Sequence, residues 1–343
     1  MTKQNGSSMK SVQRTFSPGA YLPHRPQSEA EREGKCNVCT QIEHEPTKFQ
    51  TMASLEIQTL TETLIYELTK AFALPQTARS RATIRFVFGK AARAAAEVGI
   101  NLDRVVAEGG LSAGARWILP RFVKSHAARG VDNFPSRGPL VIAANHPASV
   151  DSIVISAHVE RPDYKVIIGD IPFFQRLPHI NERAFFAPEP SDTMGRMQVI
   201  RDSIRHLKSG GALLIFPRGG IEPDPEFMPD ADAEFDHWSR SLEIFLQRVP
   251  GLQILVAIVS GVIKPAFMRH PITRFRKARP DRQRLAFLYQ LARQLLAGRE
   301  LFGLTPRVTF GEIVTGINHE HTLADIERAA RRTLRQHTAW NQV

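Results

Sequence analysis

The sequence predicts an α/β fold with a mostly parallel central sheet flanked by helices and preceded by an N-terminal helical segment. Two observations carry this prediction. From about residue 135 onward, short apolar runs alternate with segments of helical periodicity, which is typical of parallel strands joined by helices. Between about residues 54 and 124, apolar residues recur at helical spacing without intervening strands. The chain has 343 residues, which is enough to bury a large core.

The first 50 residues have no periodic pattern. Segment 1–50 is rich in Ser, Pro, Gln, Glu and Lys, a composition typical of disordered chain. It contains Cys36 and Cys39, with His44 nearby. A structural zinc site takes four ligands, usually as two pairs, and here a single pair of cysteines is present. We therefore interpret 1–50 as a disordered tail with two incidental thiols, and we expect no metal site.

The next region, 51–130, is predicted to be helical. Its first helix has leucine or phenylalanine at every fourth position from Leu60 to Phe72 and ends at Pro75. A second helix follows, with arginines off its apolar side. Segment 116–124 then places aromatic and aliphatic residues among cations. Two interpretations stay open for this segment: a stretch lying in a lipid interface, or a core helix whose cations extend to solvent. The region 51–130 is thus a candidate membrane-docking segment.

The region 131–343 contains the predicted sheet. The motifs of dinucleotide-binding and P-loop proteins, G-x-G-x-x-G and G-x-x-x-x-G-K-[ST], are absent, which argues against the nucleotide-binding versions of this fold. Strands are expected at 139–144, 164–168, 184–186, 212–216, 252–259 and 307–310, and helices at 149–159, 197–207, 283–296 and 323–335.

The charge balance favours an anionic partner. Lys and Arg exceed Asp and Glu by 45 to 34, a formal charge of +11 at pH 7. An excess of this size suits a membrane surface, a nucleic acid or an acidic carrier protein. No apolar run approaches the roughly 18 residues of a spanning helix, and the N-terminus has no apolar signal region. We expect a cytoplasmic protein that is peripherally associated with the inner face of the membrane.

The most informative stretch runs from Val141 to Asp151, with the sequence VIAANHPASVD. The residue before a proline is held in extended backbone, so His146 is expected at the end of a strand, with Pro147 opening the following helix. Asp151 then falls in the second turn of that helix, and helical side chains lean towards the N-terminus. Its carboxylate is therefore expected to contact the imidazole of His146.

This pair has a catalytic and a structural interpretation. A carboxylate on one ring nitrogen of a histidine fixes the tautomer and leaves the other nitrogen as a base. Such a base can take the proton of a hydroxyl that attacks a thioester, with a rate gain of about 10²- to 10⁴-fold. In the structural alternative, His146 only ends a strand and Asp151 only favours the helix N-terminus. The position favours catalysis, because open α/β sheets bind ligands at strand-to-helix junctions, and 213–220 forms a second such junction.

Four segments resemble signature blocks of the glycerolphosphate and lysophosphatidic-acid acyltransferase family, and their order and spacing agree over about 135–314. Asn145-His146-Pro147 with Asp151 resembles the first block. Segment 216–220 (FPRGG) resembles the third block, which reads Phe-Pro-Glu-Gly-Thr-Arg in the family, and 255–259 resembles the apolar fourth block. Segment 308–312 resembles the strand with Gly-Glu near the end of these domains.

The resemblance implies an O-acyltransferase of phospholipid biosynthesis, with 131–343 as its acyltransferase domain. It implies His146 as the general base and Asp151 as the residue that orients it. A fatty acyl group would move from acyl-CoA or acyl carrier protein to a hydroxyl of a lyso-phospholipid or glycerolphosphate-type acceptor. The donor is a co-substrate, and no cofactor is implied. The expected partners are a membrane lipid surface, the thioester donor and a lyso-lipid acceptor. Nucleic acid is not expected, because no reading motif accompanies the charge.

The third block departs from the family pattern where the acceptor phosphate would bind. Arg218 stands in place of the family's glutamate, and 220–221 (Gly-Ile) replace its threonine and phosphate-binding arginine. The second block has no arginine in register, although Arg183 lies just before it. Arg218 can bind a phosphate through its planar fork or pair with Glu222 or Asp224, and both remain open. The predicted substrate-binding residues are Asn145, Arg183, Arg218, Gly219 and Gly220.

A second basic feature is the stretch 269–284, which holds seven Lys or Arg residues. It fits a solvated loop, a contact with anionic headgroups worth about 1 kcal/mol per cation, or a docking site for an acidic carrier protein.

Two other functions would use the same scaffold. One is a non-catalytic lipid-binding module whose altered third block has removed activity. The other is an acyl thioesterase, in which water takes the place of the acceptor. The intact pair of His146 and Asp151 argues against the first, because binding alone does not require a base.

Overall fold

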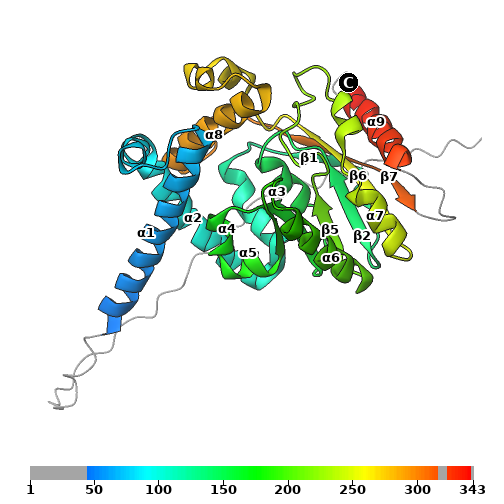
Figure 1. The fold of residues 1–343 in the computed structure, drawn as a ribbon, viewed down its shortest axis with the longest axis horizontal. Helices are drawn as coiled ribbons and strands as arrows, with labels where there is room; N and C mark the ends of the chain where they lie inside the picture. The colour runs from blue at the N-terminus through cyan, green and yellow to red at the C-terminus, as the bar shows by residue number, and fades with distance from the viewer. Residues whose placement is uncertain (1–44, 316–322, 341–343) are drawn as a thin grey trace, which may run out of the picture. The chain divides into compact units, whose positions relative to one another are not determined.

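The computed structural model describes residues 45–315 and 323–340, with side chains from residue 54 onward (Figure 1). Contacts divide the chain after residue 48, and the sheet with its helices belongs to the unit from Phe49 to Val343. Cys36, Cys39 and His44 lie outside the described residues, as does most of the predicted tail.

A seven-stranded sheet forms the centre of this unit, with the strand order β1-β7-β6-β2-β5-β3-β4. Strands β6, β2, β5, β3 and β4 are parallel to one another, β7 is antiparallel to β6, and β1 is parallel to β7. The predicted α/β class with a mostly parallel sheet is therefore confirmed. The strands are β1 (Ala127–Arg129), β2 (Leu140–Ala144), β3 (Tyr164–Gly169), β4 (Ala184–Ala187), β5 (Ala212–Ile215), β6 (Gln253–Ser260) and β7 (Arg307–Thr315).

Helices flank the sheet and precede it (Figure 1). The predicted N-terminal helical segment is present as α1 and α2, and α2 is interrupted at Gly110, whose φ is +74°. A glycine tolerates this left-handed backbone without a steric penalty. The helices are α1 (Glu45–Ala71), α2 (Ala78–Ile118), α3 (Val150–Ser156), α4 (Pro172–Gln175), α5 (Pro178–Glu182), α6 (Thr193–Lys208), α7 (Ser241–Arg248), α8 (Arg279–Ala297) and α9 (Leu323–Ala339).

Both faces of the sheet are buried, because side chains alternate between two cores along each strand. In β2, Leu140, Ile142 and Ala144 belong to the core that α2, α3 and α8 cover. Val141 and Ala143 belong to the core that α6, α7 and α9 cover. This explains why the predicted strands are continuous apolar runs rather than alternating patterns.

Segment 116–124, for which a lipid interface was one alternative, is part of the first core. Leu119, Phe122 and Val123 are buried, and Trp117 packs partly buried against the same cluster. The guanidinium of Arg121 lies 5.1 Å from the centre of the Trp117 ring. The structure therefore supports the core-helix interpretation, with cations at the periphery. The lipid-interface interpretation of this segment is wrong.

The strand register fixes where the site lies. In β2, Ala143 pairs with Ile215 of β5, and Ala144 pairs with Ala257 of β6. The residues that follow β2 and β5 therefore meet at one edge of the sheet, where parallel strands present their carboxyl ends. No helix in the described part of the chain combines the length and the apolar composition that a membrane span requires.

Candidate active site

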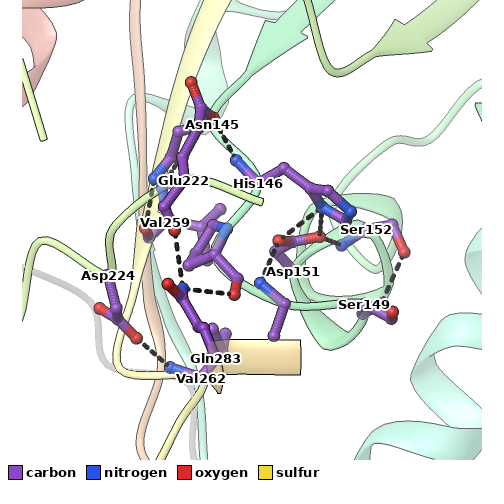
Figure 2. Close-up of polar contacts among 12 residues, drawn as sticks. Asn145, His146, Ser149, Asp151, Ser152, Glu222, Asp224, Val259, Val262 and Gln283 are labelled. Carbon is purple, nitrogen blue, oxygen red and sulfur yellow. Dashed lines mark hydrogen bonds and ion pairs between the residues drawn. The ribbon is translucent and has the colours of Figure 1, made fainter. Parts of the chain in front are cut away.

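His146 and Asp151 contact each other at the carboxyl end of β2, as the sequence predicts (Figure 2). The Nδ1 atom of His146 lies 3.0 and 3.1 Å from the two carboxylate oxygens of Asp151. The Asp151 side chain is fully buried, while 24% of the His146 side chain is exposed. The carboxylate lies inside the protein, and the imidazole is mostly buried with a part of its surface exposed.

Asp151 lies in the first turn of α3, not in the second turn as predicted, because the helix begins only at Val150. Its carboxylate also accepts the backbone N–H of Ala148 at 2.9 Å and that of Ser152 at 2.6 Å. Donors converge on this carboxylate from three sides, so the Nδ1 atom of His146 carries a proton and donates it as well. In the neutral form of the imidazole, the Nε2 atom is then the unprotonated nitrogen.

The charges around His146 act in opposite directions on its pKa. Burial of the imidazole lowers this pKa, but the charge and hydrogen bond of Asp151 raise it, as does the charge of Glu222. The nearby cation of Arg284 lowers it again. The net result is a pKa above the ordinary value of 6.5. The neutral, basic form of His146 is therefore reached on the alkaline side of that value.

Glu222 holds the main chain at His146, a role that the sequence did not reveal. Its carboxylate accepts the backbone N–H of His146 at 2.5 Å and the indole N–H of Trp238 at 2.9 Å. Its own backbone N–H donates to the carbonyl of His146 at 2.9 Å. The side chain is buried, and burial raises the pKa of Glu222 to about 7. Glu222 is thus a positioning residue for the histidine.

The raised pKa of Glu222 predicts a specific pH dependence of stability. In the unfolded chain this carboxyl ionises near 4.5, and in the folded protein near 7. Between these values the folded state holds a proton that the unfolded state has lost, so stability falls as the pH rises. Glu222→Gln cannot ionise. We therefore expect the free energy of unfolding of the wild type to fall relative to the variant between about pH 5 and about pH 8.

Urea unfolding at several pH values measures this difference. Asp224, whose pKa is raised by burial to about 6, contributes equally to both proteins and cancels. A difference that does not change with pH would show that Glu222 ionises normally in the folded protein.

The side-chain amide of Asn145 forms hydrogen bonds within the protein. Its amide nitrogen donates to the carbonyl of Val259 at 3.0 Å, and its oxygen accepts the Val259 N–H at 2.8 Å. The side chain is buried. Because this amide bonds to β6 with both of its polar groups, the structure argues against the predicted contact of Asn145 with substrate and assigns it to joining β2 to β6.

Arg183 lies away from the site. It directly precedes β4, and its Nη1 atom donates to the carbonyl of Pro162 at 3.2 Å. The start of β4 lies beside Val166 of β3, at the amino end of the parallel strands. His146 lies at the carboxyl end, on a strand separated from β4 by β5 and β3. Arg183 therefore lies at the amino end of the parallel strands, away from His146, and its role in substrate binding stays a prediction.

Arg218 follows two residues after Phe216, which packs on the histidine, and it pairs with Glu234. The ring of Phe216 packs on that of His146, with centroids 4.3 Å apart, and the turn closes with a 3.0 Å hydrogen bond from Gly219 N–H to the Phe216 carbonyl. The Arg218 Nε atom donates to Glu234 at 2.7 Å, which leaves both terminal nitrogens without a hydrogen bond to the described residues.

The alternative that Arg218 pairs with Glu222 or Asp224 is wrong, because both acidic side chains are buried and bonded elsewhere. Asp224 accepts the backbone N–H of Gly261 at 2.9 Å and that of Val262 at 3.1 Å, which fixes the turn to the end of β6 (Figure 2).

Gly219 and Gly220 border open space. Gly219 has a φ of +67°, and a β-carbon at this position would meet no atom within 4 Å. At Gly220 the nearest atom is the Nη1 of Arg218, at 3.8 Å. Their role in substrate binding stays a prediction.

Helix α8 docks on the loop that carries the histidine. The amide nitrogen of Gln283 donates to the carbonyl of Pro147 at 2.8 Å and to that of Glu222 at 2.7 Å (Figure 2). Arg279, one turn earlier, donates to Glu234 at 2.7 Å. The basic stretch 269–284 therefore reaches the site through α8. From the sequence alone, Gln283 was only one residue of a predicted helix.

Together these features define an α/β domain with a carboxylate-oriented histidine at the carboxyl edge of a parallel sheet. Residues 126–238 match the family model described as Acyltransferase. The match includes the segments that resemble the first and third blocks and supports the predicted family.

A structure of the 1-acyl-sn-glycerophosphate acyltransferase PlsC from Thermotoga maritima is similar to this chain. The similarity has a TM-score of 0.41 and 14% sequence identity, and it covers 85% of this chain and 98% of that one. No curated protein matches the sequence significantly.

Proposed function

We propose that this acyltransferase moves a fatty acyl group from acyl-CoA or acyl carrier protein to a hydroxyl of a lyso-phospholipid or glycerolphosphate-type acceptor. His146 is the general base, and Asp151 orients it. The observation that carries this proposal is the contact of 3.0 Å between His146 and the buried Asp151 in a domain of the acyltransferase family.

The reaction follows from the free Nε2 atom of His146. This atom accepts the proton of the acceptor hydroxyl while the hydroxyl oxygen attacks the thioester carbonyl. The imidazolium that forms is stabilised by Asp151, to which Nδ1 donates. The tetrahedral intermediate then loses its carbon–sulfur bond, and the proton passes from Nε2 to the departing thiolate. The products are an ester and a free thiol, and no acyl-enzyme is required.

We assign the acyl chain of a substrate to a pocket with a volume of about 420 Å³. Its lining combines the apolar side chains of Phe227, Met228 and Met268 with the charged side chains of Asp230, Glu234 and Arg279. Pro223, which follows Glu222 directly, also lines it, so the pocket begins beside the residue that holds His146. Flexible methionine side chains adapt to chains of different shape.

Filling this pocket is expected to change chain-length preference. Met228→Trp replaces a flexible side chain by a bulkier one, so we expect a lower kcat/KM for long-chain acyl-CoA and little change for short-chain acyl-CoA. Competition between a short and a long donor, read by mass spectrometry, measures the ratio. An equal loss for both donors would place the acyl chain elsewhere.

Peripheral binding to an anionic membrane is part of the proposal, with the region 51–130 as docking segment. The ring of Phe72 on α1 lies 5.5 Å from that of Phe88 on α2 and 6.1 Å from that of Phe275, so these three segments adjoin. Phe86 is 92% exposed and Phe275 is 73% exposed. Exposed aromatic rings on a chain with a formal charge of +11 suit an anionic lipid interface.

The proposal is tested by incubating purified protein with a panel of acceptors and a thioester donor, either acyl-CoA or an acyl carrier protein that carries a fatty acyl group. The panel contains glycerol 3-phosphate, several lyso-phospholipids and an amino-lipid, and products are read by mass spectrometry. We expect an acylated acceptor and an equal amount of free thiol. Free fatty acid without acylated product would instead indicate a thioesterase. Lipid binding without either product would indicate a non-catalytic module.

A further inference from the structure

Arg284 lies on the side of α8 that faces the histidine loop. Three residues further along, on the same face of the helix, Phe287 is buried in the core that contains Ala148 and Val150. The neighbouring Gln283 donates to the carbonyl of Pro147. Arg284 itself is exposed. It therefore lies at the solvent edge of the contact between α8 and the segment that directly follows His146.

The charge of Arg284 is not neutralised by a carboxylate of the described residues. Two other arginines of the basic stretch are paired: Arg276 bonds to Asp281 at 2.6 Å, and Arg279 bonds to Glu234 at 2.7 Å. Arg218 shares Glu234 with Arg279 through its Nε atom. The whole guanidinium fork of Arg284 is thus available for an anion.

We propose that Arg284 binds the phosphate of the acceptor and so determines which hydroxyl compounds the dyad acylates. This inference rests on the proposed function. In a glycerolphosphate the phosphate lies only a few bonds from the hydroxyl, so the group that binds it must lie near the base. The phosphates of a thioester donor lie a full pantetheine arm away from the reacting carbonyl. Proximity to His146 therefore favours the acceptor as the source of the phosphate.

This assignment offers a replacement for the cations that the third block lacks. Arg218 is held by Glu234 through Nε, and residue 221 is isoleucine. Arg284 approaches from α8, well outside that block. An arginine fork and a phosphate form paired, charge-assisted hydrogen bonds, which gives selectivity for phosphorylated acceptors.

The test is the acceptor selectivity of Arg284→Gln. Rates are measured with one acyl-CoA and two short-chain acceptors below their micelle concentrations, 1-acylglycerol 3-phosphate and the phosphate-free 1-acylglycerol. We expect the KM for the phosphorylated acceptor to rise about 10- to 100-fold, as for loss of a hydrogen bond to a charged group. At a pH on the plateau of the rate profile, the KM for acyl-CoA and the transfer to 1-acylglycerol are expected to stay unchanged.

Two further variants and a pH profile complete the test. Arg284→Lys keeps the charge but not the fork, so it is expected to recover part of the loss. Arg293→Gln is the control: Arg293 is also exposed, but it lies over two helical turns further along α8 and on about the opposite side of the helix. This variant should retain the wild-type KM for both acceptors. Asp151, Glu222 and Arg284 all act on His146, and loss of the cation shifts the acid limb of the Arg284→Gln profile to higher pH.

The inference is overturned if Arg284→Gln slows both acceptors equally or leaves both unchanged. A raised KM for acyl-CoA alone would assign the arginine to a donor phosphate and overturn it too. A wild type that acylates no phosphorylated acceptor would overturn the proposed acceptor class itself, and this result is seen before any variant is measured.

Discussion

Replacing His146 by glutamine is expected to lower kcat by about 10²- to 10⁴-fold, the usual contribution of a general base. The KM for the donor should change little, because the imidazole acts on the hydroxyl and not on the thioester. Asp151 keeps its two backbone hydrogen bonds from Ala148 and Ser152, so the loop should keep its conformation. Single-turnover transfer to a lyso-phospholipid measures the chemical step directly.

The chain provides a matched control for this variant. His179 also contacts a carboxylate, with Nδ1 2.8 Å from Asp103, and 45% of its side chain is exposed. It lies in α5, just before the amino end of β4, away from the edge that carries His146. His179→Gln should therefore keep wild-type activity. Full activity in His146→Gln, or an equal loss in both variants, would contradict the proposed role of His146.

The second large effect is expected for Asp151→Asn. An amide accepts from Nδ1 less well than a carboxylate, so the imidazole is no longer held with Nε2 unprotonated. We expect kcat to fall by about 10²- to 10⁴-fold at high pH. The fall should be in kcat more than in KM, because the lost interaction strengthens as the imidazolium forms.

The same variant should also move the pH profile. Burial lowers the pKa of His146, and the charge and hydrogen bond of Asp151 more than compensate. Without that charge burial dominates, so the pKa falls. The acid limb of the kcat profile should therefore move to lower pH, although the plateau is reduced. A limb that moves to higher pH, or stays in place, would show that Asp151 does not set the ionisation of His146.

The two variants separate catalysis from binding. Both should retain association with anionic lipid vesicles, since neither substitution changes the exposed aromatic side chains of Phe86 and Phe275. If vesicle binding is lost together with activity, a folding defect rather than a lost base explains the result, and thermal unfolding would detect it.

The reliable predictions from the sequence concern features encoded by neighbouring residues. His146 and Asp151 are five positions apart, and the proline after the histidine and the helix that follows bring them together through local sterics. Apolar periodicity likewise predicts the core strands and helices, because it reports which side chains must be buried. The predicted turn for Asp151 was one too late, since α3 begins only at Val150.

Contacts between distant residues were decided by the tertiary structure. Glu222 reaches His146 across 76 positions, and Gln283 reaches Pro147 across 136. Such pairs depend on strand order and on the path of α8, which local patterns do not encode. The direction of β7 and the short strand β1 were also set by pairing within the sheet.

Three arginines show which features the sequence predicted and which depended on the tertiary structure. The sequence placed Arg183 and Arg218 near blocks that resemble the family signature, but strand order puts Arg183 at the amino end of the parallel strands and Glu234 holds Arg218. In the sequence, Arg284 was one cation of a basic stretch. The structure gives it a position near the histidine loop, because α8 packs on that loop through Gln283. The sequence by itself determined that His146 and Asp151 lie together, because their geometry is local. Only the tertiary structure decided which cations surround them, because charges meet across the fold through packing that no local pattern specifies.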